Sequence, residues 1–343
     1  MAYAIKKGSD YFNTVLYTGN GSTNAITVGF QPDFIWIKRR NGSPSDSNMI
    51  QDSVRGLDKF LITNGTFAEQ SQNDSDGVTS YDTNGFTLGY TDSDAWNSNS
   101  NTYVAWNWRG SDSAAVTNTN GSITSQVSAN PTAGFSIVTW TGNGSNGATV
   151  GHGLGNAPEW VIVKRRDSSG DDWLHYHQSL GATKSIAFDT AAAITSSTRW
   201  NNTTPSSSLI TLGTSTGVNG SGATYVAYCW SEIAGFSKFG SYTGNGSADG
   251  TFVYTGFRPA VVLVKRTDGV QNWTIYDSVR DTDNVVQNLL VPNTTGAETT
   301  YGIYDFLSNG FKLRNTDTAF NGSGANYIYM AFAETPMKFA NAR

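Results

Sequence analysis

Thr18-Gly-Asn-Gly-Ser22 occurs three times in the chain, and this repetition decides how the fold is read. The same five residues return at positions 141–145 and 243–247. The second copy begins 123 residues after the first, and the third begins 102 residues after the second. This period is longer than the roughly 20 to 50 residues of solenoid and propeller repeats. Each copy is therefore expected to be a small domain.

The same ordered landmarks follow every copy of this motif. A corner with a proline comes first, then an apolar run that ends in a lysine, and finally an aromatic segment. The prolines are Pro32, Pro158 and Pro259, the lysines are Lys38, Lys164 and Lys265, and the aromatic segments are residues 103–108, 225–230 and 327–332. Because the lysines are spaced by 126 and 101 residues, the whole unit and not only the motif has been repeated.

Alternating apolar residues and frequent turns predict short strands within each copy. Asn20-Gly21 suits a tight hairpin turn, and the run from Phe34 is apolar at every position, as in a strand covered on both faces. In the first copy, strands are expected at residues 12–17, 25–30, 34–37, 49–52, 59–62, 78–81, 86–88 and 103–108. The predicted fold is all-β, with three tandem β-sandwich modules of a jelly-roll or lectin-like kind. Helix is expected for at most a turn or two, at residues 53–57 and 187–193.

Composition sets the expected boundaries. Residues 111–133 contain no aromatic residue and are expected to form a linker, with docking of Val116, Ile123 and Val127 on a module as an open alternative. The predicted organisation is an N-terminal arm (1–10), module 1 (11–110), the linker, module 2 (134–233), module 3 (234–334) and a C-terminal tail (335–343).

The bulk composition argues against several classes of protein. Charged residues make up 14% of the 343 residues and the formal net charge is −5, so a nucleic-acid partner is not expected. No stretch reaches the roughly 18 apolar residues of a spanning helix, and no export signal is recognisable, so membrane insertion is not expected. The single cysteine, Cys229, lies in an aromatic segment and is expected to be buried.

Two acid–arginine pairs stand at equivalent positions. Asp52 precedes Arg55, and Asp277 precedes Arg280, each three residues apart after a predicted strand. The second copy has His177 in place of the aspartate. Such a pair either locks the strand exit or presents a fork that binds a ligand or partner.

Two indoles are candidates for surface contacts. Trp96 precedes the recurring Asn97, and Trp200 lies in a polar loop. Each side chain would either stack on a sugar or a partner, or cap its own module.

The sequence predicts no catalytic residues, no cofactor and no metal site. No nucleophile elbow or phosphate-binding loop is present, and glutamates do not recur at equivalent positions. His175 and His177 share a strand face, but a metal site needs at least three convergent ligands. Two Asp-rich loops, at residues 92–94 and 281–284, leave Ca²⁺ as an open alternative.

The repeats resemble those of virion proteins from marine and environmental tailed phages. The resemblance rests on residues 133–145, 151–166 and 219–228, and it extends over nearly the whole chain. Proteins of that group are labelled tail fibre or structural protein, and resemble lectin-like sandwich domains in outline.

The resemblance implies a virion structural protein, assembled in the host cytoplasm, that acts as a tail fibre or adhesin component contacting the host surface. The alternatives are a capsid decoration protein and, as the enzyme class, a polysaccharide-degrading tailspike. The implied partners are other virion proteins and a host surface glycan. The chain is expected to form a homo-oligomer or to occur in several copies per particle, although three internal copies also let one chain mimic a trimer.

Overall fold

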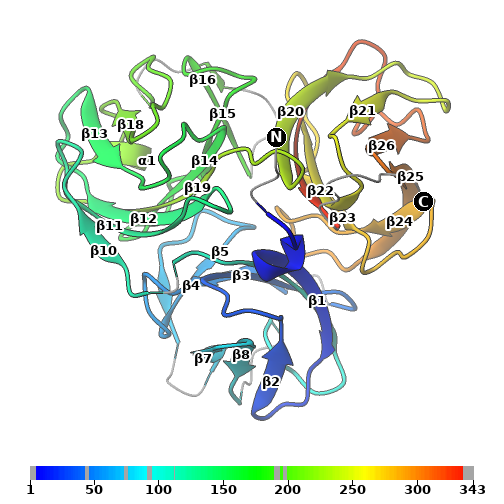
Figure 1. Cartoon of the computed structure of the whole chain (residues 1–343), viewed down its shortest axis with the longest axis horizontal. Coiled ribbons are helices and arrows are strands. Elements are labelled where there is room, and N and C mark those ends of the chain that lie inside the picture. Colours follow the sequence, from blue (N-terminus) through cyan, green and yellow to red (C-terminus); the bar gives the residue numbers. More distant parts are fainter. Residues whose placement is uncertain are drawn as a thin grey trace.

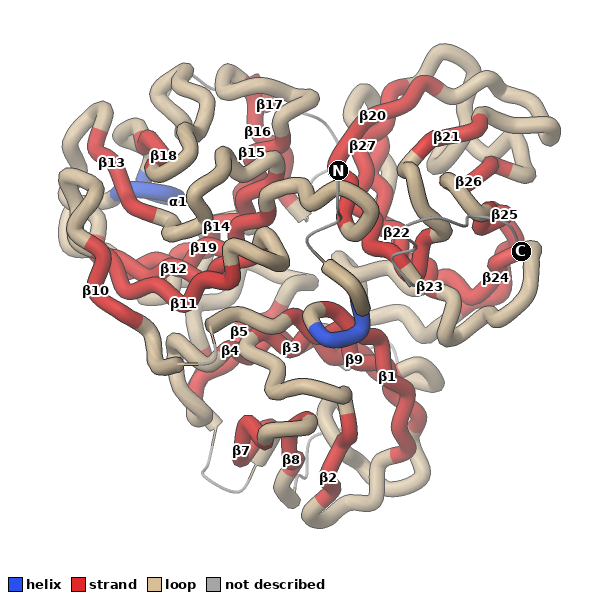
Figure 2. The backbone as a smooth tube through the Cα atoms, viewed as in Figure 1, coloured by secondary structure: helices blue, strands red, loops and turns tan. Residues whose placement is uncertain are grey.

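In a computed structural model, the protein is nearly all β, and its antiparallel sheets are grouped into three lobes around a common centre (Figure 1). The structure describes residues 5–42, 46–72, 76–90, 95–111, 113–188, 194–195 and 199–334. The tail at 335–343 and the Asp-rich loop at 92–94 lie outside the described residues. Helix is confined to η1 (Gly8–Asp10) and α1 (Thr216–Asn219) in the described parts (Figure 2), and neither is long and apolar enough to cross a membrane.

Lobe 1 (residues 5–110) contains two sheets. In sheet order, the larger one consists of β1 (Phe12–Thr18), β9 (Thr102–Trp108), β3 (Phe34–Arg39), β4 (Met49–Asp52), β5 (Lys59–Ile62) and β6 (Gln70–Ser71). The smaller one consists of β2 (Asn24–Thr27), β8 (Gly85–Leu88) and β7 (Val78–Asp82). The eight strands predicted from this copy are present, although the strand expected at residues 25–30 ends at Thr27 and the short β6 was not predicted. The helical turn expected at residues 53–57 is instead a non-helical turn.

Lobe 2 (residues 111–233) repeats this plan with a wider sheet. That sheet consists of β10 (Val116–Asn118), β11 (Ser125–Asn130), β12 (Phe135–Thr141), β19 (Thr224–Trp230), β14 (Trp160–Arg165), β15 (Leu174–His177), β16 (Lys184–Ala187) and β17 (Ile194–Thr195). The second sheet pairs β13 (Ala148–Gly151) with β18 (Leu209–Leu212). The linker prediction for residues 111–133 is wrong, because β11 pairs with β12 and β10 pairs with β11, so that both strands extend the lobe 2 sheet. Ile123 and Val127 pack in the lobe 2 cluster, whereas Val116 is exposed.

Lobe 3 (residues 234–334) has two four-stranded sheets. One consists of β20 (Ser237–Thr243), β27 (Asn326–Ala333), β22 (Pro259–Arg266) and β23 (Thr274–Asp277). The other consists of β21 (Phe252–Tyr254), β26 (Gly310–Leu313), β25 (Thr299–Leu307) and β24 (Val286–Leu289). Strands that carry the same repeated motif occupy the same position in the sheet of each lobe.

The alternation of side chains along each central strand serves two cores at once. In β3, Ile35 and Ile37 belong to a hydrophobic cluster within lobe 1, to which Phe86 of β8 also belongs. Phe34 and Trp36 point the other way and join a cluster built from all three lobes. Successive residues of a strand face opposite sides of the sheet, so a strand between two cores must be apolar at every position.

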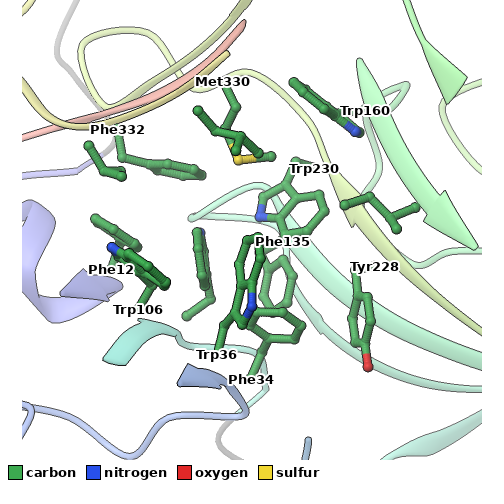
Figure 3. Close-up of a cluster of buried hydrophobic side chains, with 14 of the residues drawn as sticks. Phe12, Phe34, Trp36, Trp106, Phe135, Trp160, Tyr228, Trp230, Met330 and Phe332 are labelled. Carbon is green, nitrogen blue, oxygen red and sulfur yellow. The ribbon is translucent and has the colours of Figure 1, made fainter. Parts of the chain in front are cut away.

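The cluster shared by the three lobes lies at the centre of the molecule (Figure 3). Its aromatic members contact one another across lobe boundaries: the rings of Phe34 and Tyr228 are 4.5 Å apart, and those of Phe12 and Phe332 are 4.9 Å apart. The cavity inside the cluster holds only about 10 Å³. Since a water molecule needs roughly 10–15 Å³, the three lobes are closely packed at their centre.

The repeated Thr-Gly-Asn-Gly-Ser motif forms a loop that a buried asparagine holds in each lobe. In lobe 3, Asn321 Nδ2 donates to the carbonyl oxygen of Ser247 (2.8 Å) and to Asn245 Oδ1 (2.9 Å), while its Oδ1 accepts from Asn245 N (3.0 Å). Asn97 and Asn219 make the same bonds in the other lobes. The recurrence of the motif is therefore explained by turn geometry.

Candidate functional site

The most concentrated buried charge lies where neighbouring lobes meet. We call these boundaries the 1–2, 2–3 and 3–1 seams, after the lobes that they join. All four charged residues singled out from the sequence lie in the 1–2 and 3–1 seams, at the exits of equivalent strands.

The 1–2 seam contains Asp52, at the end of β4, and Arg55, in the following turn. Asp52 Oδ1 accepts from the backbone N–H groups of Val54 (3.1 Å) and Arg55 (2.9 Å), and Oδ2 accepts from Arg55 Nε (2.5 Å). Both side chains are completely buried. Tyr228 of lobe 2 also donates its hydroxyl to Asp52 Oδ2 at 2.7 Å. The pair therefore fixes its own turn and binds the neighbouring lobe.

The 3–1 seam repeats this arrangement with Asp277, at the end of β23, and Arg280. Arg280 donates its backbone N–H to Asp277 Oδ1 (2.9 Å) and its Nε to Oδ2 (2.7 Å), and both side chains are completely buried. The outside donor is Trp106 of lobe 1, whose Nε1 lies 3.1 Å from Asp277 Oδ2. Trp106 stands at the strand position that Tyr228 occupies in lobe 2, so the two seams are built alike.

A glutamate extends each pair to a second arginine across the seam. Glu69 Oε2 accepts from Arg55 Nη1 (3.0 Å), and the two oxygens of Glu69 accept from Nε and Nη2 of Arg166 in lobe 2 (2.8 and 2.9 Å). Glu298 accepts from Arg280 Nη1 (2.9 Å) and, in the same two-pronged way, from Arg40 of lobe 1 (3.0 and 2.8 Å). Two-pronged arginine–carboxylate contacts fix geometry as well as charge.

The charges in these chains depend on one another. Burial alone would raise the pKa of Glu298, but the hydrogen bond from Arg40 and the charge of Arg280 outweigh it and hold that pKa below its ordinary value. Burial likewise acts to lower the pKa of Arg280, and the charges of Asp277 and Glu298 reverse the shift. Each group therefore stays ionised in the interior because its partners are in place.

The 2–3 seam has uncharged side chains at the corresponding positions. His177 replaces the aspartate, Leu180 the first arginine, and Thr267 the arginine on the receiving lobe. Met330 stands where Trp106 and Tyr228 stand in the other lobes. Glu69 directly precedes β6 and Glu298 directly precedes β25, whereas the residue directly before β17 is Ala193. His177 keeps the local turn, because its Nδ1 accepts from the backbone N–H of Ser179 (3.1 Å). Burial lowers the pKa of His177 to about 3, so its ring is neutral at pH 7.

A second kind of contact crosses all three seams. The side chain just before β4, β15 or β23 donates to a backbone carbonyl of the preceding lobe in the ring: Trp173 to Ile62 (2.9 Å), Trp273 to Ala187 (2.9 Å) and Asn48 to Pro292 (2.8 Å). These three residues are equivalent in the three copies, so the lobes are tied head to tail in a closed ring.

The structure buries both acid–arginine pairs, and each pair holds the turn at its own strand exit, the first of the two interpretations that the sequence allows. The bonds that Asp52 and Asp277 accept from the neighbouring lobe were not predicted. The surface prediction for Trp96 and Trp200 is wrong. Their exposed fractions are 2% and 1%, because Trp96 packs in the lobe 1 cluster and Trp200 in the lobe 2 cluster. A polar loop in the sequence does not reveal that its single indole turns inward.

The remaining candidates from the sequence serve local structure. Asp281 accepts hydrogen bonds from the backbone and side chain of Asn288, within its own loop. Cys229 is buried, which raises its pKa to about 12. Among the described residues, no three His, Cys, Asp or Glu side chains converge as a metal site would require.

The sequence model of one protein family, described as "Domain of unknown function (DUF7483)", matches residues 7–336. The chain belongs to this family. No curated protein and no solved structure matches the chain. The matched range spans all three lobes and is not confined to a single repeat.

Sequence reasoning about this DUF7483 chain missed the second half of each charged chain, namely Arg40 with Glu298 and Arg166 with Glu69. One signal was available. Arg40 and Arg166 follow the repeated lysine at the same offset, and the third copy has Thr267 there, in parallel with the loss of the aspartate in the second copy. The glutamates offer no such signal, because their loops differ in length.

Proposed function

We propose that the three lobes are tandem β-sandwich modules and that the chain is a structural protein of a phage virion, acting as a tail fibre or adhesin component that contacts the host surface. Two features support the modular interpretation. Both sheets of each lobe contribute to one hydrophobic cluster, and the equivalent strands carry the same motifs. The virion setting rests on the resemblance of the repeats.

The observation that carries the proposal is the aromatic cluster at the centre together with the seams around it. Buried indoles and phenyl rings from three lobes, and charged chains across two seams, hold the lobes in one fixed arrangement. A protein that transmits force or presents surfaces at fixed angles needs such rigidity. The buried charges are committed to it, because their hydrogen bonds are made to neighbouring lobes.

The proposal also specifies partners. Other virion proteins would anchor the chain during assembly in the host cytoplasm, and a host surface glycan would be the target of a tail-mounted copy. A ring of three similar lobes matches the symmetry of a threefold platform, so a single chain suits a position that a trimer would otherwise occupy.

Immunogold labelling of intact particles tests the location. Label at the tail would support the proposed function, whereas label over the shell would favour the capsid decoration alternative. Absence of label from purified particles that contain other tail proteins would contradict both.

Competition for adsorption tests the contact with the host. Purified folded chain should slow adsorption of the phage to its host, and heat-unfolded chain should not. If the folded chain binds no host envelope at saturating concentration, the adhesin function is wrong. Loss of host polymer during incubation would favour the tailspike alternative instead.

A further inference from the structure

One edge of the second sheet of each lobe is formed by equivalent strands, and the three strands differ in what covers them and in their side chains. These strands are β2, β13 and β21, at the outer side of each lobe (Figure 1). The peptide groups along an edge strand face alternately toward the paired strand and away from it. Those that face away are unpaired and can accept a further strand.

The lobe 2 edge is covered by the chain itself. Ile123, in the segment that leads into β11, forms a parallel bridge with Val150 of β13, and its N–H donates to the carbonyl oxygen of Thr149 at 2.9 Å. Ser122 adds two bonds to Thr149, from its backbone N–H to Oγ1 (2.9 Å) and from Thr149 N to its Oγ (2.8 Å). Ser125 Oγ donates to the carbonyl oxygen of Gly151 at 3.0 Å. Residues 121–125 therefore act as an added strand.

The backbone of residues 121–125 lies close against the backbone of β13. A Cβ atom on Gly121 would lie 2.3 Å from the carbonyl oxygen of Thr149, so a side chain at this position would push the segment away from β13. The segment that covers this edge is thus part of the additional residues, 111–133, with which lobe 2 begins. The connection before lobe 3 has no such insertion, since only a few residues separate β19 from β20.

The equivalent edge of lobe 3 is open. Gly147 and Gly250 make equivalent hydrogen bonds, from their N–H groups to the carbonyl oxygens of Leu212 and Leu313. Counting onward from these two glycines, Thr149 of lobe 2 corresponds to Phe252 of lobe 3, and Gly151 corresponds to Tyr254. Thr255 N donates to Asn309 of the paired hairpin, which means that the peptide groups of Phe252 and Tyr254 face outward. Among the described residues, no hydrogen bond reaches the outward-facing peptide groups of these two residues.

Large aromatic side chains flank this open edge. Phe252 is 43% exposed and Tyr254 is 64% exposed, although rings of this size usually bury most of their surface. The lobe 1 edge has the small residues Ala25 and Thr27 at the same two positions. Exposed aromatic groups beside unpaired peptide groups are the two components that strand-addition sites use for specificity and affinity.

We propose that the β21 edge of lobe 3 is a docking site for an extended segment of a partner protein, which adds to the sheet in parallel orientation. The segment should resemble residues 121–125, with hydroxyl side chains around one branched apolar residue, because the equivalent lobe 2 edge already binds that chemistry. Its backbone bonds to the peptide groups of Phe252 and Tyr254, and its side chains pack beside their rings. This site is independent of the virion proposal, since any partner with such a segment fits it.

A labelled peptide of residues 118–127 (Asn-Thr-Asn-Gly-Ser-Ile-Thr-Ser-Gln-Val) is the probe, and the intact chain is the receptor. Fluorescence anisotropy should show saturable binding, and hydrogen exchange should slow at the amides of Phe252 and Tyr254. A peptide with proline in place of Ile123 loses the key N–H donor and should bind at least tenfold more weakly.

Two variants of the chain separate the edge from the rest of the surface. Tyr254→Pro removes an outward N–H without disturbing the pairing to β26, and should weaken peptide binding at least tenfold. Thr27→Pro makes the same change at the open lobe 1 edge and should leave binding unchanged. Thermal unfolding of both variants verifies that they are folded.

Three outcomes would overturn the proposal. One is the absence of saturable binding by a chain whose unfolding is normal. Another is equal binding by the Tyr254→Pro variant. The last is concentration-dependent dimerisation, measured by sedimentation, that Tyr254→Pro abolishes while the peptide fails to compete. That result would assign the edge to a second copy of the chain.

Discussion

The 3–1 and 2–3 seams join similar lobes by different means. The 3–1 seam contains a buried chain of four charged residues, whereas the 2–3 seam has His177, Leu180 and Thr267 at the corresponding positions. Both seams border the same aromatic cluster and share the hydrogen bond from an indole or amide to the preceding lobe. The aromatic cluster and a few neutral hydrogen bonds therefore join lobes 2 and 3 without a buried acid–arginine chain at these positions.

The loss of charge in the 2–3 seam is concerted. Leaving one arginine without its acid in the interior would cost several kcal/mol, whereas replacing the whole set with uncharged side chains is close to neutral. The substitutions at His177, Leu180, Thr267 and Met330 fall on both sides of the seam, which is the pattern that this energetic rule requires.

The largest expected effect comes from breaking one buried pair. Asp277→Leu leaves Arg280 buried with one acid fewer and should lower the free energy of unfolding by about 3–5 kcal/mol. Denaturant unfolding followed by tryptophan fluorescence measures the change. His177→Leu, at the equivalent place in the 2–3 seam, should cost only about 1–2 kcal/mol. Equal losses would show that the two seams do not differ in the way described.

Acid should weaken the two kinds of seam in different pH ranges. His177 has a pKa of about 3 in the folded chain and about 6.5 when unfolded, so the unfolded state binds more protons between these values and stability falls as the pH drops from about 6.5. The pKa of Glu298 is depressed from 4.5, so its contribution is complete above that pH and is lost only below it.

Unfolding free energies at pH 6 and pH 4 separate the two effects. His177→Asn keeps an acceptor for the turn and removes the titration, and should abolish about 2–3 kcal/mol of the decrease between these pH values. Glu298→Gln should remove less than about 1 kcal/mol of this decrease, because the unfolded glutamate takes up its proton only near the lower end of the range. A profile that His177→Asn does not alter would contradict the burial of a neutral imidazole.

The pair across the 3–1 seam should show measurable coupling. A double-mutant cycle of Arg40→Ala and Glu298→Ala is expected to give about 1–2 kcal/mol, since the contact is two-pronged and mostly shielded from water. The exposed pair Lys7–Asp10 is the control, with an expected coupling of about 0–0.5 kcal/mol. Similar coupling energies for the two pairs would show that the seam contact stabilises the fold no more than an exposed ion pair does.

The smallest effect is expected from Gln178, whose side chain crosses the 2–3 seam. Gln178 Nε2 donates to the carbonyl oxygen of Phe239 at 2.7 Å, but the side chain is exposed. Gln178→Met should cost about 0.5–1 kcal/mol in the same unfolding assay. A loss above about 2 kcal/mol would mean that this seam depends on polar contacts as much as the other two.

Local features of the fold could be predicted from the sequence, and contacts between copies could not. The pattern of apolar residues placed eight of the nine strands of lobe 1, all but the two-residue β6, and Phe34 to Ile37 correctly indicated a strand covered on both faces. The pattern does not say whether the second cover is a sheet of the same lobe or a neighbouring lobe. For this reason the sequence could not predict the central cluster, or the hydrogen bonds from Tyr228 to Asp52 and from Trp106 to Asp277.

The errors have physical causes. The segment 111–133 looks like a linker because β10, at the edge of the sheet, and β11, next to it, are rich in polar residues, and only Ile123 and Val127 are buried within it as large apolar residues. Trp96 and Trp200 look exposed because their neighbours in sequence are polar, whereas burial depends on neighbours in space. The pairing of Asp52 with Arg55 was readable, since both residues belong to one turn.

The closed ring has a consequence for synthesis of the chain. The 3–1 seam joins the first lobe to the last, so the aromatic faces of lobes 1 and 2 lack their full cover until lobe 3 has emerged from the ribosome. At about 5–20 residues per second, the last hundred residues take roughly 5–20 s to make. During that interval the nascent chain displays Trp108, Phe34 and Trp230 without a complete core around them, and it should be a client of chaperones that bind aromatic surfaces.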